Sequence, residues 1–477
     1  MNNTLRYSLL SGIIGIAGSL HSVYAYTSTA DSGLLQELSM MKIPLVVVNT
    51  VDGEEPSCDG IDAPPGQWGA GITNVTKVPA SMQIILEGDT LYDSGEYVKK
   101  ESGLTIKIRG NTSGTKPKKP YKLKLQKKAD LLFRGDKKYK DKDWVLLRTG
   151  NTLITPIGNW AGELVGQEWT PSCRHVNMVM NGTYRGLYVL CEQLTVNPEC
   201  RIDVDEKDGY VVEADAYWWN EDISFPSTLT APQLQFTYKY PDPEDLTEEW
   251  HEAISADVIA HEAKISDATY DEAYDCESFA KWLVAWELLG NDDAAGANMY
   301  IVKKDADSKI CMGPMWDFDR GMNLEGDWIG IHYKNFYFHH MLNSSNPTFR
   351  NAFTSLWKEK GREVADGIID RINAFAASEE ASDYQRSIDI ENELDFPYDW
   401  WQPYLGSLEY MRTYCTEFIS RRADWIDAKM SEESGVDAFG SSTERENVNA
   451  YDVLGRPVSP DTPGLQIRDG RKVFIKP

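Results

Sequence analysis

The pattern of apolar and polar residues changes character about halfway along the chain. Up to Tyr240, apolar residues alternate with polar ones in short runs, which is typical of β-strands with one buried face. Beyond that point they recur every three or four residues, which predicts amphipathic helices. The pattern therefore predicts an α+β protein with a β-rich N-terminal lobe, residues 26–240, and a mostly helical C-terminal lobe, residues 241–430.

Strand signals recur throughout the N-terminal lobe. The expected strands are Ile43–Asn49, Met82–Leu86, Leu104–Ile108, Tyr121–Leu125, Trp144–Leu147, His175–Met180, Tyr184–Leu190, Tyr210–Glu213 and Gln235–Tyr240. The clearest hairpin contains Asn181-Gly182, because this pair supplies the two positive-φ positions of a type I′ turn. Glu192 ends that hairpin and is expected to be a surface carboxylate or a partner of a lysine. A short helix is expected over Ile157–Val165.

The helical lobe opens with two expected helices, Leu246–Ala263 and Glu277–Leu289. Asp275 is placed to cap the second helix and Gly290 to stop it. The loop that follows runs from Asn291 to Asn298.

Two short strands, Asn298–Lys303 and Lys309–Met315, are expected to form a hairpin after this loop. The hairpin would return the chain and bring Asp317 close to Asp293. Helices should then continue from Pro347 to Met430.

Both ends of the chain carry segments typical of exported proteins. Arg6, the apolar run Leu9–Leu20 and the small-residue site ending at Ala25 predict a signal peptide over residues 1–25, with a retained anchor as the alternative. The protein is thus expected in the periplasm, on the outer surface or outside the cell. After a polar linker, residues 431–450, residues 451–477 resemble C-terminal sorting or anchoring segments, the alternative being a pair of edge strands packed on the main domain.

Seven cysteines would be free to oxidise after export, and an odd number cannot all pair within one chain. Cys191 and Cys200 are close enough in sequence to bridge. Buried free thiols are the alternative, and no Cys/His cluster indicates zinc.

The net charge of -26 argues against general nucleic-acid binding, because phosphates would be repelled. Membrane contact is expected only through anchoring. Charge is unevenly spread, since Lys99 to Arg148 holds 17 Lys and Arg against 5 Asp and Glu. This segment is either a solvated lysine-rich hairpin or an anion site, for which the turn Gly110–Gly114 would offer N–H groups and hydroxyls.

Three polar residues beyond this segment occur in an order that protein kinases use. There, an Asp orients or deprotonates the acceptor hydroxyl, and an Asn followed by a second Asp holds Mg²⁺ on the nucleotide phosphates. Asp293, Asn298 and Asp317 stand in that order. Without this order, each would be interpreted as part of a solvated loop or turn.

Five motifs in sequence make the similarity more specific: Ile108 to Ser113, Lys118 to Leu123, Gly186 to Glu192, Asn291 to Asn298 and Trp316 to Asp319. In this order they resemble the CotH spore-coat kinase family. The resemblance implies an atypical protein-kinase-like two-lobed fold and phosphorylation of secreted or surface proteins with ATP and Mg²⁺ or Mn²⁺.

The resemblance also implies residue roles. Asp293 would be the catalytic base, and Asn298 and Asp317 the metal ligands. Lys119 or Lys122 would bind phosphate, with Arg109 and Glu192 also among the nucleotide-binding residues. The roles of Asp292 and Asp319 cannot be separated from those of their neighbours by sequence.

The chain departs from the family pattern at three places. Asn151-Thr152 and Gly158-Asn159 stand where the family often has Asp-x-Thr and Arg-Asn, and Ala294 lacks a basic side chain often found after the catalytic Asp. The alternative is therefore a catalytically inactive exported surface-binding protein, a pseudokinase, which the scarcity of ATP outside the cytoplasm favours. A carbohydrate-active protein, suggested by Trp218-Trp219 and Trp400-Trp401 beside many carboxylates, ranks last because nothing in the sequence pairs those carboxylates.

Overall fold

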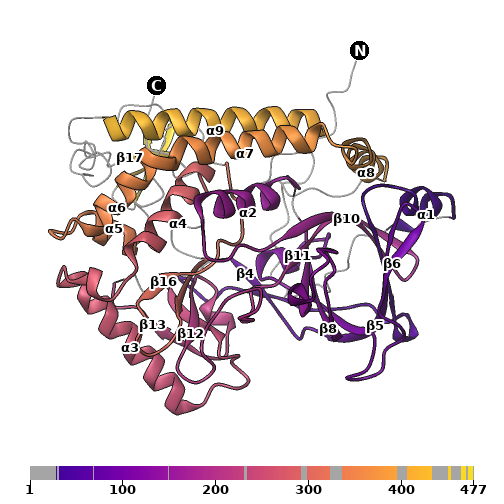
Figure 1. Cartoon of the computed structure of the whole chain (residues 1–477), viewed down its shortest axis with the longest axis horizontal. Helices are drawn as coiled ribbons and strands as arrows, with labels where there is room; N and C mark the ends of the chain where they lie inside the picture. The colour runs from indigo at the N-terminus through magenta and orange to yellow at the C-terminus, as the bar shows by residue number, and fades with distance from the viewer. Residues whose placement is uncertain are drawn as a thin grey trace.

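A computed structural model describes residues 28–29, 32–67, 69–148, 150–229, 234–291, 298–322, 336–394, 406–431, 450–452, 464–468 and 471–475. Within this part the protein is α+β, with strands gathered in the N-terminal half and helices in the C-terminal half, as predicted (Figure 1). The expected signal peptide, residues 1–25, lies outside the described residues. Residues 432–449 of the expected linker also lie outside them.

Seven strands of the described chain close into a barrel in the order β11-β10-β2-β5-β7-β8-β9, and β9 pairs with β11 to complete the circle. Neighbours are antiparallel except β10 and β2, which run parallel. The bounds are β2 Leu45–Thr50, β5 Val78–Leu86, β7 Leu104–Ile108, β8 Tyr121–Ala129, β9 Asp141–Leu147, β10 Cys173–Met180 and β11 Thr183–Glu192.

The apolar residues that alternate along the sequence of each strand fill the interior of this barrel. Leu104, Ile106 and Ile108 of β7 are buried in one apolar cluster with residues of the other six strands, while Thr105 and Lys107 are less buried. Inward and outward residues must alternate along every barrel strand, and closure leaves no unpaired edge. The barrel itself was not predicted, and the two-lobed kinase-like arrangement stays a prediction.

A second sheet, in the order β13-β14-β12-β15-β16, carries the hairpin expected near Asp317. Its strands are β12 Tyr210–Asp215, β13 Ser224–Pro226, β14 Gln235–Tyr240, β15 Met299–Lys303 and β16 Ile310–Met312. The expected strands 210–213 and 235–240 are confirmed, and the second strand of the hairpin is shorter than predicted.

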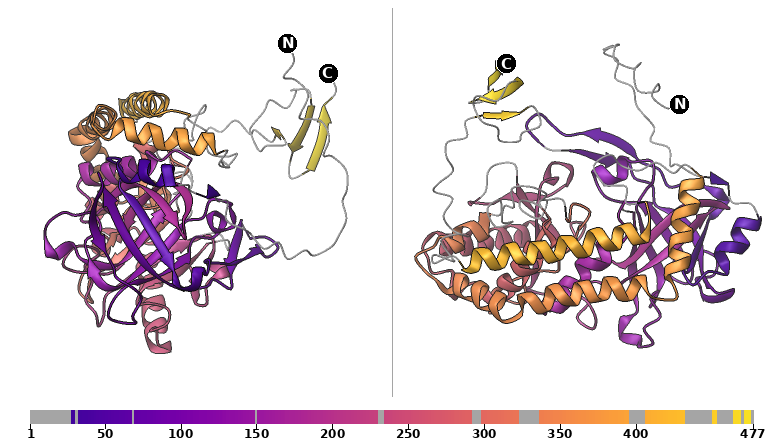
Figure 2. Two further views of the ribbon diagram at one scale, coloured as in Figure 1. Left: turned by 90° about the vertical axis from the view of Figure 1, so that its right-hand side faces the viewer. Right: turned by 90° about the horizontal axis from the view of Figure 1, so that it is seen from above.

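Short strands complete the β-structure. β1 Ser28–Thr29 and β6 Asp89–Asp93 extend the barrel sheet, and β3 Asp59–Asp62 pairs with β4 Ala70–Thr73. Strands β17 Ala450–Asp452, β18 Gly464–Arg468 and β19 Arg471–Ile475 pair with one another and with no other described strand (Figure 2). The sorting or anchoring role of this tail stays a prediction.

Helices form the other side of the molecule, where α7 and α9 lie side by side and α2 and α4 pack beneath them (Figures 1 and 2). The bounds are α1 Ser32–Ser39, α2 Ile154–Val165, α3 Glu248–Ser266, α4 Cys276–Leu289, α5 Phe336–Leu342, α6 Thr348–Leu356, α7 Arg362–Ala376, α8 Ala381–Glu393 and α9 Leu408–Ser431. No helix in the described ranges is both long and apolar enough to cross a membrane.

Helix α4 is the central helix and has the ends that the sequence predicted. The Asp275 carboxylate accepts hydrogen bonds from the N–H groups of Glu277 and Ser278. Gly290 adopts the left-handed conformation, φ 55°, and its N–H closes the last turn. Ten residues of the helix are buried, so its position is set by packing on several sides.

A fully buried ion pair joins this last turn to α9. The Arg422 guanidinium donates one hydrogen bond from Nη2 to the Glu287 carboxylate at 2.7 Å and another from Nε to the Glu287 carbonyl oxygen at 2.6 Å. Neither side chain is exposed to solvent. Arg422 also lies over the Trp425 ring, 4.3 Å from its centroid. The pair fixes the residues from which the next loop departs.

Replacing Arg422 by Met should lower the free energy of unfolding by about 3–5 kcal/mol, because Glu287 would remain as a buried charge without its partner. Urea denaturation measures the change. The double variant Arg422→Met/Glu287→Met should regain part of the loss, since no buried charge is left. Arg421→Met is the matched control: this exposed neighbour should change stability by less than about 0.5 kcal/mol. Equal effects at the two arginines would contradict the prediction.

Candidate functional site

The β15–β16 hairpin brings two predicted metal ligands to the same end of the second sheet. Ile301 lies opposite Met312, and the Gly313 N–H donates to the Tyr300 carbonyl oxygen at 2.7 Å. Asn298 immediately precedes β15, and Asp317 follows β16 by five residues. The predicted return of the chain is therefore confirmed for its described part.

The end of α4 holds the Asp317 segment in place. The buried Asn291 side chain donates to the Asp317 carbonyl oxygen at 3.0 Å, and the Met322 N–H donates to the Leu289 carbonyl oxygen at 2.7 Å. Asn291 begins the loop that contains Asp292 and Asp293, and both of these acids lie outside the described residues. The start of the predicted catalytic loop is thus tied to the predicted metal ligand.

Both predicted metal ligands have an unusual backbone conformation. Asn298 has φ 57° and Asp317 has φ 64°. Most side chains avoid this left-handed region, but Asn and Asp are enriched in it. Such conformations persist where the surrounding contacts determine them, and they cluster at functional sites.

The carboxyl of Asp317 lies in a crowded, negatively charged environment. Surrounding protein atoms and the nearby Asp319 raise its pKa to about 8, while Arg109 acts in the opposite direction. The Asp317 side chain is also open to solvent, so the shift reflects crowding on part of its surface rather than complete enclosure. Arg109 reaches this region from the end of β7, with its guanidinium carbon 5.7 Å from the centroid of the Trp316 ring.

No group of three or more His, Cys, Asp or Glu side chains with metal-binding geometry occurs in the described ranges. The predicted ligand set includes an Asn, and its neighbours Asp292 and Asp293 fall in the gap 292–297. Among the described residues, Asn298, Asp317 and Asp319 are therefore the candidate oxygen ligands for a cation at this site.

The glycine turn expected to bind phosphate is folded on itself. Residues Thr112–Thr115 form a 3₁₀ turn, and the Lys119 ammonium, 1% exposed, donates to the Gly114 carbonyl oxygen at 2.8 Å. Burial lowers the pKa of Lys119 to about 8. The turn also contacts the loop that follows β12, because the Thr112 and Tyr217 hydroxyls lie 2.8 Å apart. Lys119 thus stabilises the turn from inside.

Lys122, the other predicted phosphate-binding lysine, is more accessible. Its ammonium lies 3.3 Å from the Asp143 carboxylate of β9, and 29% of its side chain is exposed. Lys107 lies directly opposite it on β7. The pair places two cations on the outer face of the barrel.

A model of the CotH kinase protein family matches residues 106–426, which is most of the chain and includes each of these features. The chain belongs to the CotH kinase protein family. The resemblance found in the sequence is therefore confirmed. A search of curated proteins finds no match.

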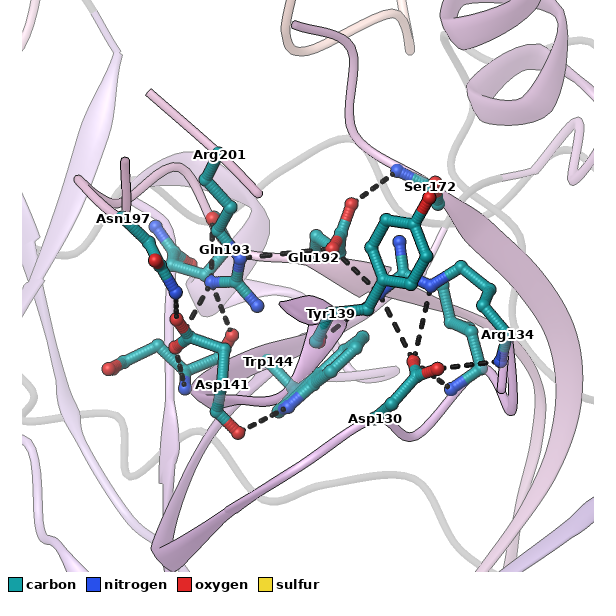
Figure 3. Close-up of polar contacts among 12 residues, drawn as sticks. Asp130, Arg134, Tyr139, Asp141, Trp144, Ser172, Glu192, Gln193, Asn197 and Arg201 are labelled. Atoms are coloured by element: carbon teal, nitrogen blue, oxygen red, sulfur yellow. Dashed lines mark hydrogen bonds and ion pairs between the residues drawn. The ribbon is translucent and has the colours of Figure 1, made fainter. Parts of the chain in front are cut away.

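Glu192 of this CotH family member is buried, and both expectations for its surroundings are wrong. Its carboxylate accepts from Arg134 Nη2 at 2.9 Å and from the Ser172 N–H at 2.8 Å, with Arg201 Nε 3.8 Å away (Figure 3). Among the described residues it has no lysine partner, and it does not lie at the surface. Because both oxygens are engaged by the protein, its observed role is to join β11 to the segments around it.

A polar group beside the site was not predicted from the sequence. Glu213 of β12 lies opposite Tyr300 of β15, whose hydroxyl donates to the Glu213 carboxylate at 2.9 Å. Lys239 pairs with the same carboxylate at 2.7 Å. Burial raises the pKa of Glu213 to about 7 and also that of the Tyr300 hydroxyl, to which the charges of Glu213 and Asp317 contribute.

Alternation along β12 was the available signal for this group, since it puts Glu213 and Asp215 on one face of the strand. The pairing of Glu213 with Tyr300 could not be predicted from the sequence, because 87 residues separate the two along the chain.

Phe318 anchors the Asp317 segment from the other side. Its ring stacks on Trp286 of α4 with centroids 5.3 Å apart. A Cβ atom added at Gly158 of α2 would lie 2.2 Å from the Phe318 ring. Glycine at this position therefore leaves room for the ring.

Gly158→Ala should destabilise the protein by about 1–3 kcal/mol, because the new methyl group overlaps the Phe318 ring. In a Phe318→Ala background the same change should instead stabilise by up to about 1 kcal/mol, since Ala is the better helix former. Denaturant unfolding of the four proteins gives the coupling. A destabilisation that persists without the ring would contradict this explanation.

Proposed function

We propose that this CotH family member transfers the γ-phosphate of ATP, as a Mg²⁺ or Mn²⁺ complex, to a hydroxyl group of an exported protein. The observation that best supports the proposal is the position of Asn298 and Asp317, which lie at one end of a hairpin that Asn291 ties to α4. Family membership supports kinase-like chemistry, and the signal-peptide pattern supports export.

The residues present fit a divalent cation. Asp317 and Asp319 offer carboxylate oxygens close to each other, and burial together with the charge of Asp319 raises the pKa of Asp317. Asn298 adds an amide oxygen, and hard divalent cations prefer oxygen ligands of this kind. A bound cation would spread the charge that develops on the transferred phosphoryl group.

The other residues of the proposed site have separate roles. The Asp293 carboxylate would accept the proton of the acceptor hydroxyl, and its loop begins at the fixed Asn291. Arg109, which lies over the Trp316 ring and whose charge acts on Asp317, would face the anionic phosphates. Lys122 would add a second cation from the barrel.

The conservative variant Asp317→Asn should weaken metal-dependent ATP binding at least tenfold, or about 1.4 kcal/mol, because it removes one anionic ligand. Calorimetry with Mg²⁺ or Mn²⁺ measures the affinity, and transfer of labelled phosphate measures turnover. Asp293→Ala should retain nucleotide binding and lose transfer, since the base acts only on the acceptor.

Asp307→Asn is the matched control, because this exposed acid lies at the opposite end of the same hairpin. It should bind nucleotide as the parent does. A parent protein that shows neither metal-dependent ATP binding nor transfer would overturn the kinase proposal.

The two candidate lysines should behave differently when each is replaced by Met. Lys119→Met should lower the free energy of unfolding by about 1–3 kcal/mol, because the buried Gly114 carbonyl loses its ammonium donor and keeps only a long contact with the Cys58 thiol. Lys122→Met should mainly weaken ATP binding, by several-fold. Thermal unfolding and calorimetry separate the two effects.

Lys124→Met is the control for both, since this exposed lysine lies two residues further along β8. Weaker ATP binding with unchanged stability in Lys119→Met would instead assign the phosphate to the buried lysine.

A second candidate is an exported binding protein of the same family that does not transfer phosphate. The Gly158 position favours it, because the Phe318 ring leaves no room here for the arginine side chain that the family resemblance leads us to expect. Metal-dependent nucleotide binding without transfer to any tested acceptor would support this alternative.

A further inference from the structure

Two cysteines face each other on neighbouring barrel strands. Cys173 begins β10, and Cys191 is the penultimate residue of β11; the two are direct partners in the antiparallel register. Directly opposed residues have Cα atoms about 4.5–5.5 Å apart, within the range of about 4.4–6.8 Å that disulfides span. The Cys191 thiol is also in hydrogen-bonding contact with Cys173. The backbone therefore needs no rearrangement to be cross-linked here.

The residues next to the two cysteines hold this register. The Glu192 N–H donates to the Ser172 carbonyl oxygen at 3.1 Å, and the Ser172 N–H donates to the Glu192 carboxylate at 2.8 Å. Arg134 fixes the same carboxylate at 2.9 Å (Figure 3). Ser172 directly precedes Cys173, and Glu192 directly follows Cys191, so the strand ends that carry the thiols cannot easily separate.

Exposure differs between the two thiols. Cys191 is fully buried, whereas Cys173 is partly exposed and its sulfur accepts a hydrogen bond from Asn159 Nδ2 at 3.3 Å. Burial raises the pKa of the Cys191 thiol. A reagent from solution would therefore meet Cys173 first.

The pair also lies beside the candidate site. Cys191 packs in an apolar cluster with Tyr300 and Trp316, and Cys173 packs against the same cluster. Trp316 directly precedes Asp317, and Tyr300 contacts Glu213. A covalent link between β10 and β11 would brace the barrel wall on which these residues rest.

We propose that Cys173 and Cys191 are an oxidation site, where a disulfide forms between β10 and β11 on reaction with a low-molecular-weight or protein disulfide. The Cys173 thiolate attacks the external disulfide RS–SR and releases one thiolate, RS⁻. The Cys191 sulfur, after losing its proton, attacks the Cys173 sulfur of the mixed disulfide and releases the second. Two cysteine thiols are oxidised, the external disulfide is reduced, and the two protons leave with two molecules of RSH.

The test uses the full chain and oxidised glutathione as the probe. After oxidation, free thiols are alkylated, the protein is digested without reductant, and the peptides are identified by mass spectrometry. The expected product joins the peptides of Cys173 and Cys191, and dithiothreitol reverses the link. The number of titratable thiols should fall by two from the seven in the sequence.

Stability gives a second readout. The oxidised protein should melt a few °C above the reduced protein, because the cross-link restricts the unfolded chain. Cys173→Ser should abolish both the linked peptide and the difference in melting temperature. Cys200→Ser, a change at another partly exposed cysteine, should leave both unchanged.

Two results would overturn the proposal. One is that Cys173 and Cys191 both remain open to alkylation after oxidation and unfolding. The other is that Cys191 is linked to Cys200, the pair that lies closer in sequence. Neither result depends on nucleotide, so the proposed kinase activity could fail while this oxidation site stands.

Discussion

The buried pair of Arg422 and Glu287 is the interaction on which the candidate site depends. It joins α9 to the last turn of α4 with contacts to both the side chain and the backbone of Glu287. Two buried charges are tolerated only when they satisfy each other, so the relative position of the two helices is narrowly defined. Gly290 and Asn291 follow within four residues, and the site is built outward from them.

The segments that follow α4 contain backbone conformations that are unfavourable in isolation. Asn298 and Asp317 both have positive φ, and such conformations persist only where surrounding contacts maintain them. The Asn291 amide holds the Asp317 carbonyl, the Gly313 N–H holds Tyr300, and the Phe318 ring is enclosed by Trp286 and Gly158. Contacts from α2, α4 and the hairpin therefore converge on residues 313–318. Such convergence is what a site with fixed ligand geometry requires.

Local signals in the sequence were sufficient for most elements. The Asn181-Gly182 turn has φ values of 51° and 74°, and the Asp275 cap and Gly290 stop of α4 occur as predicted. These features depend on a few neighbouring residues. Barrel closure depends instead on the pairing of β9 with β11 and the parallel contact of β10 with β2, which alternation in single strands does not encode.

The same limit applies to the site. Motif order identified Asn298 and Asp317, and the structure brings both to one end of the hairpin. Partners could not be predicted, because they come from distant segments: Glu192 meets Arg134 and Arg201, and Lys119 turns inward to Gly114. Asp293 remains a prediction from motif order, since it lies outside the described residues.

The partners of the basic side chains between Lys99 and Arg148 affect how a nucleotide would bind. Lys118 is buried with Glu391 at 2.6 Å, Lys119 is buried against a carbonyl oxygen, and Lys122 is shared with Asp143. Arg109, also in this segment, has a charge that acts on Asp317. A triphosphate approaching Asp317 and Asp319 would meet the oxygens of two carboxyl groups beside the guanidinium of Arg109. Its affinity should therefore depend on a divalent cation between the carboxylates and the phosphates, more strongly than in a site lined by free lysines.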